Sequence, residues 1–184
     1  TINAVEEVSD KAISLGGSTI NTRIENYSGG VLTLNGAINT VTNAGKVLYI
    51  VAKSNNVVLG GSIATNNPAN NLALALTNSV NKTLALTASN AYQGGTTVWS
   101  GNLSVSNSAA LGSGAVTFLT NATLTALASV NLTNSISVAT GRTVAVTTPQ
   151  NAGLTNQISG QVSGAGGLRI NTAGATTYLA NANN

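Results

Sequence analysis

The sequence feature that most constrains the fold is a pattern of short strands and corners that recurs about every 20 residues. Residues 90–114 show it clearly, because the segments TTVWSG and NLSVSN are followed by a corner of small residues, SAALGSG. The segment AVTFLT, which begins at Ala115, starts the pattern again. Short strands separated by Gly, Asn and Ser turns are typical of all-β proteins. We therefore expect an all-β fold built from repeated units.

The length of the repeat favours a solenoid over a sandwich. The centres of comparable strands lie at Leu84, Leu103, Leu124, Val144 and Leu168, so they recur at nearly even intervals. A period of about 20 residues is typical of coils that stack on one another. Eight or nine such coils, about 4.8 Å apart, would form a rod roughly 40 Å long. We predict a single β-solenoid domain or segment over residues 1–184, with residues 1–12 as a charged end coil or a short amphipathic helix. A β-sandwich is the alternative.

The composition agrees with stacked coils. Charged residues make up only 6% of the chain, whereas soluble domains carry roughly 25%. Hydrophobic residues make up 42%, which argues against disorder. Stacking places like residues above one another, so that Asn, Thr and Val form ladders while like charges repel. A chain stabilised by such ladders is expected to have few charges.

The charges are distributed unevenly. The segment that ends at Glu25 carries four acids and two cations and sums to −2, and the rest of the chain sums to +5. Beyond Glu25 the charged residues are Lys46, Lys53, Lys82, Arg142 and Arg169. Five cations spread over this length lack the clustering that nucleic-acid binding needs. We interpret them as solvated surface charges and expect no nucleic-acid partner.

The residue types present exclude several kinds of catalytic and metal site. The chain has no His and no Cys, which removes Ser-His-Asp triads, Cys-His dyads and His or thiolate metal sites. A glycosidase needs two facing carboxylates, for which the candidates are Glu6, Glu7, Asp10 and Glu25. Three of these crowd near the N-terminus, which favours a solvated coil. We predict no catalytic, cofactor-binding or metal-binding residues, and therefore no enzyme.

The aromatic residues leave two interpretations open. They would form a sugar-binding stripe if they were exposed on one face, and otherwise they cap the core or lie at corners. The residues concerned are Tyr27, Tyr49, Tyr92, Trp99 and Tyr178. The longest apolar runs are far shorter than the roughly 20 residues that span a bilayer, so we expect no membrane span.

Residues 90–114 resemble the passenger-associated repeat of bacterial autotransporters. The matching positions are Asn90 and Tyr92, then Gly94 to Val98, then Gly101, Leu103 and Val105, then Ala110, Leu111, Gly112 and Gly114. Trp99 departs from the family pattern, where a small polar residue is more common. The resemblance implies a right-handed parallel β-helix that is secreted by a type V route to the bacterial cell surface.

These observations lead to one expected function and one alternative. The first is a non-catalytic extracellular structural rod of an autotransporter-like surface protein, stacking head-to-tail into a filament. The alternative is an adhesin module that binds glycans or host surface proteins. The expected partners are other copies of the chain at its ends, or adjoining coils of a longer chain. The expected location is the bacterial cell surface or the surrounding medium.

Overall fold

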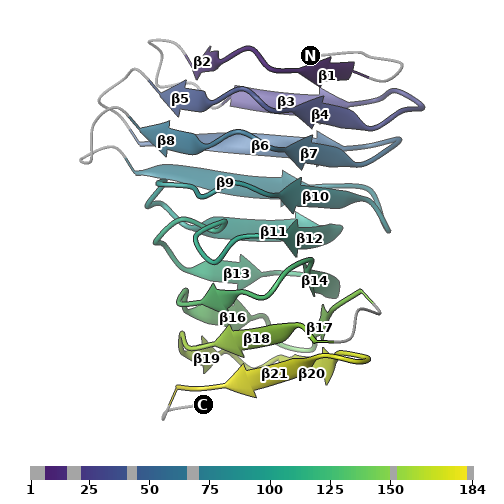
Figure 1. Ribbon diagram of the computed structural model, residues 1–184, viewed down its shortest axis with the longest axis vertical. Helices are drawn as coiled ribbons and strands as arrows, with labels where there is room; N and C mark the ends of the chain where they lie inside the picture. Colours follow the sequence, from purple (N-terminus) through teal and green to yellow (C-terminus); the bar gives the residue numbers. More distant parts are fainter. Residues whose placement is uncertain (1–6, 16–21, 41–44, 66–70, 150–152, 182–184) are drawn as a thin grey trace.

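The computed structural model describes residues 7–15, 22–40, 45–65, 71–149 and 153–181. These segments contain strands and no helix, and the strand pairs between them are parallel. Figure 1 shows the strands stacked one above another along the long axis of the molecule. The predicted all-β parallel solenoid is therefore confirmed, and the sandwich alternative is wrong. The right-handed winding and the number of coils stay predictions.

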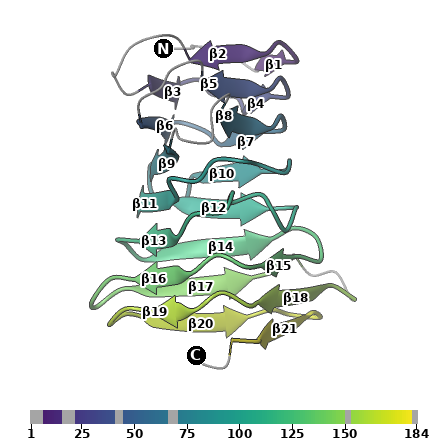
Figure 2. The same ribbon diagram turned by 90° about the vertical axis from the view of Figure 1, so that its left-hand side faces the viewer.

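Four parallel sheets run along the axis, and Figure 2 shows several of their strands side by side. The eight-stranded sheet contains, in spatial order, β1 (Glu7–Ser9), β4 (Leu32–Leu34), β7 (Val57–Leu59), β10 (Thr83–Leu86), β12 (Asn102–Val105), β14 (Ala122–Ala126), β17 (Thr143–Thr147) and β20 (Gly167–Asn171). The seven-stranded sheet contains β3 (Thr22–Asn26), β6 (Lys46–Ala52), β9 (Leu72–Thr77), β11 (Thr96–Ser100), β13 (Val116–Phe118), β16 (Ile136–Val138) and β19 (Val162–Ser163).

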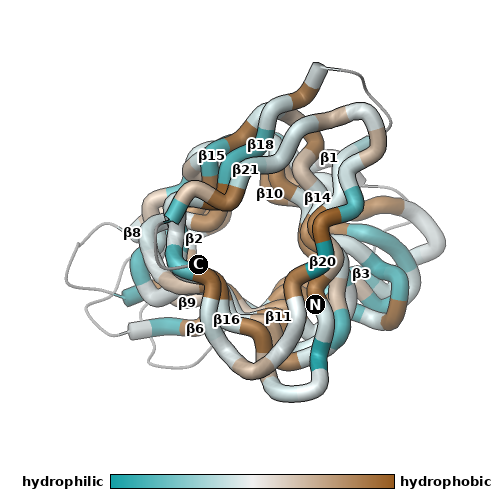
Figure 3. The backbone as a smooth tube through the Cα atoms, turned by 90° about the horizontal axis from the view of Figure 1, so that it is seen from below, coloured by the Kyte–Doolittle hydropathy of each residue, from teal (hydrophilic) through white to brown (hydrophobic). Residues whose placement is uncertain are grey.

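Two smaller sheets complete the longer coils. One contains β2 (Ile13–Leu15), β5 (Ile38–Thr40) and β8 (Ile63–Thr65). The other contains β15 (Asn131–Leu132), β18 (Thr155–Ile158) and β21 (Thr176–Leu179). Seen along the axis in Figure 3, the coils superimpose around one shared interior.

The interior is filled by rows of aliphatic side chains. Side chains alternate between the two faces of a strand, so every second residue of each strand points inward. One inward row passes through Leu32, Val57, Leu84, Leu103 and Leu124, all of them buried. Outward positions between them carry Thr, Ser, Ala and Val. Parallel pairing at a fixed register is therefore what buries the apolar half of the sequence.

The coil length depends on whether a third strand is present. The paired residues Leu32 and Val57, and then Val57 and Leu84, are far apart along the chain, and this part of the chain contains β5 and β8. The sequence separation is smaller between Leu84 and Leu103 and between Leu103 and Leu124, where no third strand lies between the paired strands. A third strand therefore lengthens a coil without changing the row to which its inward residues belong.

One predicted step was wrong. Leu124 pairs with Val146 rather than with Val144, so that step is longer than the sequence analysis had it. Val144 and Val146 both point inward and both are buried, which is why the sequence pattern could not distinguish them. The next predicted step, from Val144 to Leu168, is confirmed.

The pattern at residues 90–114 is confirmed in detail. The segments predicted as strands form β11 and β12, which belong to different sheets, and the next coil begins where Val116 pairs with Thr96. Between the two strands Gly101 has φ +84°, and a Cβ atom there would collide with the Asn78 side chain and the Lys82 carbonyl. A glycine is therefore required at this turn.

Asparagine side chains join neighbouring coils where the strands of the eight-stranded sheet begin. In three places an Asn Oδ1 accepts a hydrogen bond from the backbone N–H of the Thr that lies at the same register position in the next coil. The pairs are Asn56 with Thr83 at 2.9 Å, Asn102 with Thr123 at 2.9 Å and Asn121 with Thr143 at 2.8 Å. These bonds extend the backbone ladder into the corners, which gives Asn a structural role at these three positions.

The first described segment is part of the solenoid. Residues 7–9 form β1 and pair with β4, so the amphipathic-helix alternative is wrong for these residues, and residues 1–6 lie outside the described segments. Among the described residues, no helix has the length and apolar character needed to cross a membrane.

Candidate functional site

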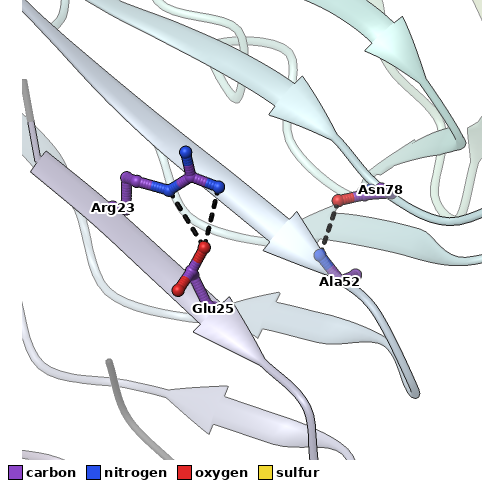
Figure 4. A network of polar contacts seen from close by, with 4 residues as sticks. All are labelled: Arg23, Glu25, Ala52 and Asn78. Atoms are coloured by element: carbon purple, nitrogen blue, oxygen red, sulfur yellow. Dashed lines mark hydrogen bonds and ion pairs between the residues drawn. The ribbon is translucent and has the colours of Figure 1, made fainter.

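The structure separates the carboxylates that the sequence offered as a catalytic pair. Asp10 follows β1 of the eight-stranded sheet and accepts a hydrogen bond from Asn35 Nδ2 at 3.0 Å. Glu25 lies in β3 of the seven-stranded sheet, where its Oε1 is 2.9 Å from Arg23 Nε and forms an ion pair with the same guanidinium, as Figure 4 shows. Glu6 lies outside the described residues, and of Glu7 only the backbone is described. Asp10 and Glu25 thus belong to different sheets and each has its own partner.

No candidate metal centre was found in the part of the chain that the structure describes. No three carboxylate, imidazole or thiol side chains lie close enough there to hold a metal ion.

Tyr92 belongs to the core. Its side chain is fully buried, and its hydroxyl lies 2.7 Å from Thr96 Oγ1. Burial raises the pKa of the Tyr92 phenol well above its ordinary value, and the hydrogen bond with Thr96 opposes this shift only in part. Tyr92 is therefore a neutral structural residue, in line with the interpretation that aromatic residues cap the core.

The other aromatic residues do not form the single stripe that was one interpretation of the sequence. Tyr27, Trp99 and Tyr178 are exposed to 48%, 56% and 55%, and Tyr49 in β6 is partly buried. Tyr27 follows β3 and Trp99 lies in β11, both strands of the seven-stranded sheet, whereas Tyr178 lies in β21 of a three-stranded sheet. Because Tyr92 is buried and Tyr178 lies on another sheet, the interpretation of these residues as one exposed stripe is wrong.

A different arrangement lies where the chain passes from the seven-stranded to the eight-stranded sheet. We call this edge the basic corner, and define it by Tyr27, Lys53, the turn 79–82, Trp99 and the turn 139–142. Backbone hydrogen bonds stack the successive segments: Lys53 N to Asn26 O at 3.0 Å, Ser79 N to Ala52 O at 2.9 Å, Leu119 N to Val98 O at 2.9 Å and Ala139 N to Phe118 O at 2.9 Å. The corner therefore runs along the axis of the rod.

Two of its turns have the same construction. In the first, Lys82 N donates to Ser79 O at 3.0 Å and Asn81 has φ +64°. In the second, Arg142 N donates to Ala139 O at 3.1 Å and Gly141 has φ +70°. Asn and Gly are the residues that adopt this left-handed conformation most readily. Each turn thus places a basic residue directly before a strand of the eight-stranded sheet.

This repetition was visible in the sequence but was not used. The segments NKTLAL and GRTVAV, beginning at Asn81 and Gly141, share a turn residue, a cation, a Thr and an alternating apolar run. Separation along the chain alone makes the cations look scattered. The interpretation of all five as solvated surface charges is wrong for Lys46, which is buried. Winding places Lys53, Lys82 and Arg142 on one edge, where Lys53 and Arg142 are exposed and Lys82 is half-buried.

Trp99 points outward beside a β-bulge. Val98 pairs with Leu76 and Ser100 with Thr77, so Trp99 is an extra residue in β11 that has no counterpart in β9. Bulges of this kind change the direction of a side chain and are frequent beside functional sites. The indole is left 56% exposed.

The turn that carries Lys82 lies against the segment that follows Trp99. Asn78 N donates to Ser100 O at 3.2 Å, and Ser100 Oγ donates to Asn78 O at 2.6 Å. Asn102 N donates to Lys82 O at 2.9 Å. On the other side of the same turn, Ala52 N donates to Asn78 Oδ1 at 2.9 Å, which Figure 4 shows. The position of Lys82 relative to Trp99 is therefore fixed by the backbone.

The basic corner combines cations with an exposed indole, and no acidic side chain follows Glu25 anywhere in the chain. Such a set can attract anions and offer a flat apolar surface, but it contains no acid–base pair. Comparisons of the chain with protein-family models, curated proteins and solved structures found no match. The resemblance to autotransporter passengers therefore stays a prediction, and the β-solenoid fold stands on the structure alone.

Proposed function

We propose that this chain is a non-catalytic structural rod of an extracellular, autotransporter-like surface protein, and that copies join end to end. The observation that supports this most is the solenoid end formed by β20 and β21. Ile170 and Leu179, which continue rows of pairs with Val146 and Ile158, are exposed to 39% and 48%. Their counterparts one coil earlier are buried. Figure 2 shows β20 and β21 at the end of the stack, with no strand beyond them among the described residues.

An uncovered solenoid end favours association. Among the described residues β20 is the last strand of its sheet, and its outer edge presents backbone N–H and C=O groups that a further parallel strand, from another copy or from adjoining coils, can satisfy. Each coil of a solenoid contacts only its neighbours, so an end coil lacks half of its stabilising contacts. A second solenoid end supplies both backbone partners and apolar cover.

Charge determines which end is the better partner. The segment up to Glu25 sums to −2 and the remainder to +5, and Arg169 lies in β20 at the positive end. Head-to-tail contact brings opposite charges together, and because it is a heterologous contact it continues into a filament. Contact between two positive ends would be repulsive.

The register indicates which residues would pair at this contact. The row that ends in Ile170 begins at Glu7 in β1, because Glu7 pairs with Leu32 and each later strand continues that row. An unbroken register between copies would thus pair the backbone of Ile170 with that of Glu7. We expect a reversible association.

Sedimentation velocity from micromolar to millimolar concentration tests the proposal. We expect the wild-type chain to self-associate in a manner that weakens with salt, and the double variant Ile170→Lys/Leu179→Lys to stay monomeric. The matched control is Leu127→Lys/Val80→Lys, which adds the same charge at exposed apolar residues away from the end and should behave as wild type. A wild-type chain that is monomeric at every concentration and salt would refute end-to-end assembly.

A further inference from the structure

We propose that the basic corner is a docking surface for an extended acidic polysaccharide, a binding function that goes beyond the role of a rod. The residues that would carry it are Lys53, Lys82, Trp99 and Arg142. The ligand class is defined by its chemistry: a carbohydrate chain that bears carboxylate or sulfate groups at intervals.

The basic corner has little opposing charge near it. Three of the five cations beyond Glu25 lie in this corner, and the chain has no acidic side chain beyond Glu25. Glu25 itself is held by Arg23 through an ion pair at 2.7 Å. A surface with one sign of charge and no counter-charge raises the local concentration of anions. The corner is therefore expected to attract polyanions.

Trp99 is the feature of the corner that favours a carbohydrate ligand. The indole is 56% exposed at an outward strand position, so a large apolar side chain faces solvent there and is available to a ligand. Aromatic rings provide a rigid, flat apolar surface with a polar N–H group at one edge. Such a surface beside cations suits a sugar ring, which has an apolar face and carries its charge at the rim.

The spacing argues for a long ligand with sparse charge. The strands that follow Lys82 and Arg142, β10 and β17, are three positions apart in the eight-stranded sheet, which corresponds to roughly 14 Å along the axis. Trp99 lies in β11, directly before β12, and so falls between them in the stack. A single sugar cannot contact all three residues at once. A chain that lies along the corner can.

The same spacing argues against nucleic acid. Duplex DNA carries one charge for about every 1.7 Å of its axis, so its binding requires many closely spaced cations. Lys53, Lys82 and Arg142 are too few and too far apart for that. A polysaccharide with one acidic group per sugar or per pair of sugars matches them better.

The test measures binding of immobilised alginate and heparin by biolayer interferometry, with neutral dextran and duplex DNA as comparison probes. We expect the wild type to bind at least one acidic polysaccharide and not dextran. Trp99→Ala and the double variant Lys82→Gln/Arg142→Gln should each weaken binding at least fivefold, and the double variant should also reduce its salt dependence. Trp99→Tyr and Lys82→Arg should retain most of the affinity.

Two matched controls separate the corner from general charge and general aromatic exposure. Arg169→Gln removes an exposed cation outside the corner, and Tyr178→Ala removes an aromatic side chain that is 55% exposed on another sheet. Both should change the affinity less than twofold. The proposal is overturned if the wild type does not distinguish acidic polysaccharides from dextran, if these controls weaken binding as much as the corner variants, or if DNA binds more tightly. Thermal unfolding of each variant verifies that it folds.

Discussion

Replacing Asn90 by alanine is expected to weaken the attachment of its coil to the coils on both sides. Asn90 is 7% exposed and reaches in both directions along the axis. Its Oδ1 accepts a hydrogen bond from Ile63 N at 2.7 Å, and its Nδ2 donates to Ala110 O at 2.6 Å. The two partners are distant in the sequence, one before Asn90 and one after it, and are joined through this one side chain.

The magnitude follows from the two groups left without partners. A buried N–H or C=O that loses its hydrogen bond costs about 1–3 kcal/mol, so Asn90→Ala is expected to destabilise the fold locally by about 2–6 kcal/mol. Each factor of ten in an opening equilibrium corresponds to about 1.4 kcal/mol. Amide hydrogen exchange at Ile63 should accordingly accelerate by at least about 30-fold, if exchange occurs through local opening.

The control is Asn131→Ala. Asn131 is exposed, and its Oδ1 accepts a hydrogen bond from Ser159 Oγ at 2.9 Å. Solvent replaces a lost hydrogen bond at such a position, so we expect an effect below about 1 kcal/mol. Hydrogen exchange followed by mass spectrometry, with urea unfolding alongside, measures both variants. Equal effects of the two substitutions, or unchanged exchange at Ile63, would refute the view that buried asparagines hold the coils together.

Three further substitutions test the core and its turns. Because the pKa of Tyr92 is raised in the folded chain, the unfolded chain loses the phenol proton first as the pH rises. The free energy of unfolding should therefore fall by about 1.4 kcal/mol per pH unit above about pH 10, and Tyr92→Phe should remove that part of the pH dependence in urea unfolding. Phe118→Ala should cost about 3–5 kcal/mol in urea unfolding because Phe118 is fully buried, whereas Leu127→Ala, at a residue 39% exposed, should cost far less. Gly112→Ala should lower the melting temperature more than Gly141→Ala, because both glycines have positive φ but only at Gly112 would a Cβ collide with the Tyr92 carbonyl; equal shifts would contradict this.

The solenoid was predictable from the sequence because its repeat is carried by the inward rows. Leu84, Leu103 and Leu124 recur at nearly constant spacing, and the structure pairs them in that order. Coil length was harder to predict, since β5 and β8 are three residues long and resemble corners in the sequence. The shift from Val144 to Val146 shows the same difficulty, because alternation fixes the face of a residue but not its partner.

The candidate site was less predictable, for a geometrical reason. Lys82 and Arg142 are far apart in the chain, and only winding places them on one edge. The bulge at Trp99 depends on pairing with β9, which a local pattern cannot specify. The shared turn motif before both cations was the usable signal for the corner, although the register places Arg142 two residues away from the row of Lys82.

One binding experiment can test both proposed roles, because a filament would display many copies of the basic corner in one line. A long polysaccharide can contact several copies at once, and linked sites raise the apparent affinity well beyond that of one site. An end variant without added charge, Ile170→Gln/Leu179→Gln, should therefore weaken binding of long alginate chains while leaving binding of short alginate oligomers unchanged. Trp99→Ala should weaken both and leave sedimentation unchanged. If the end variant weakened short and long chains equally, the corner and the end of the rod would act as one site, and the separation of the two functions would be wrong.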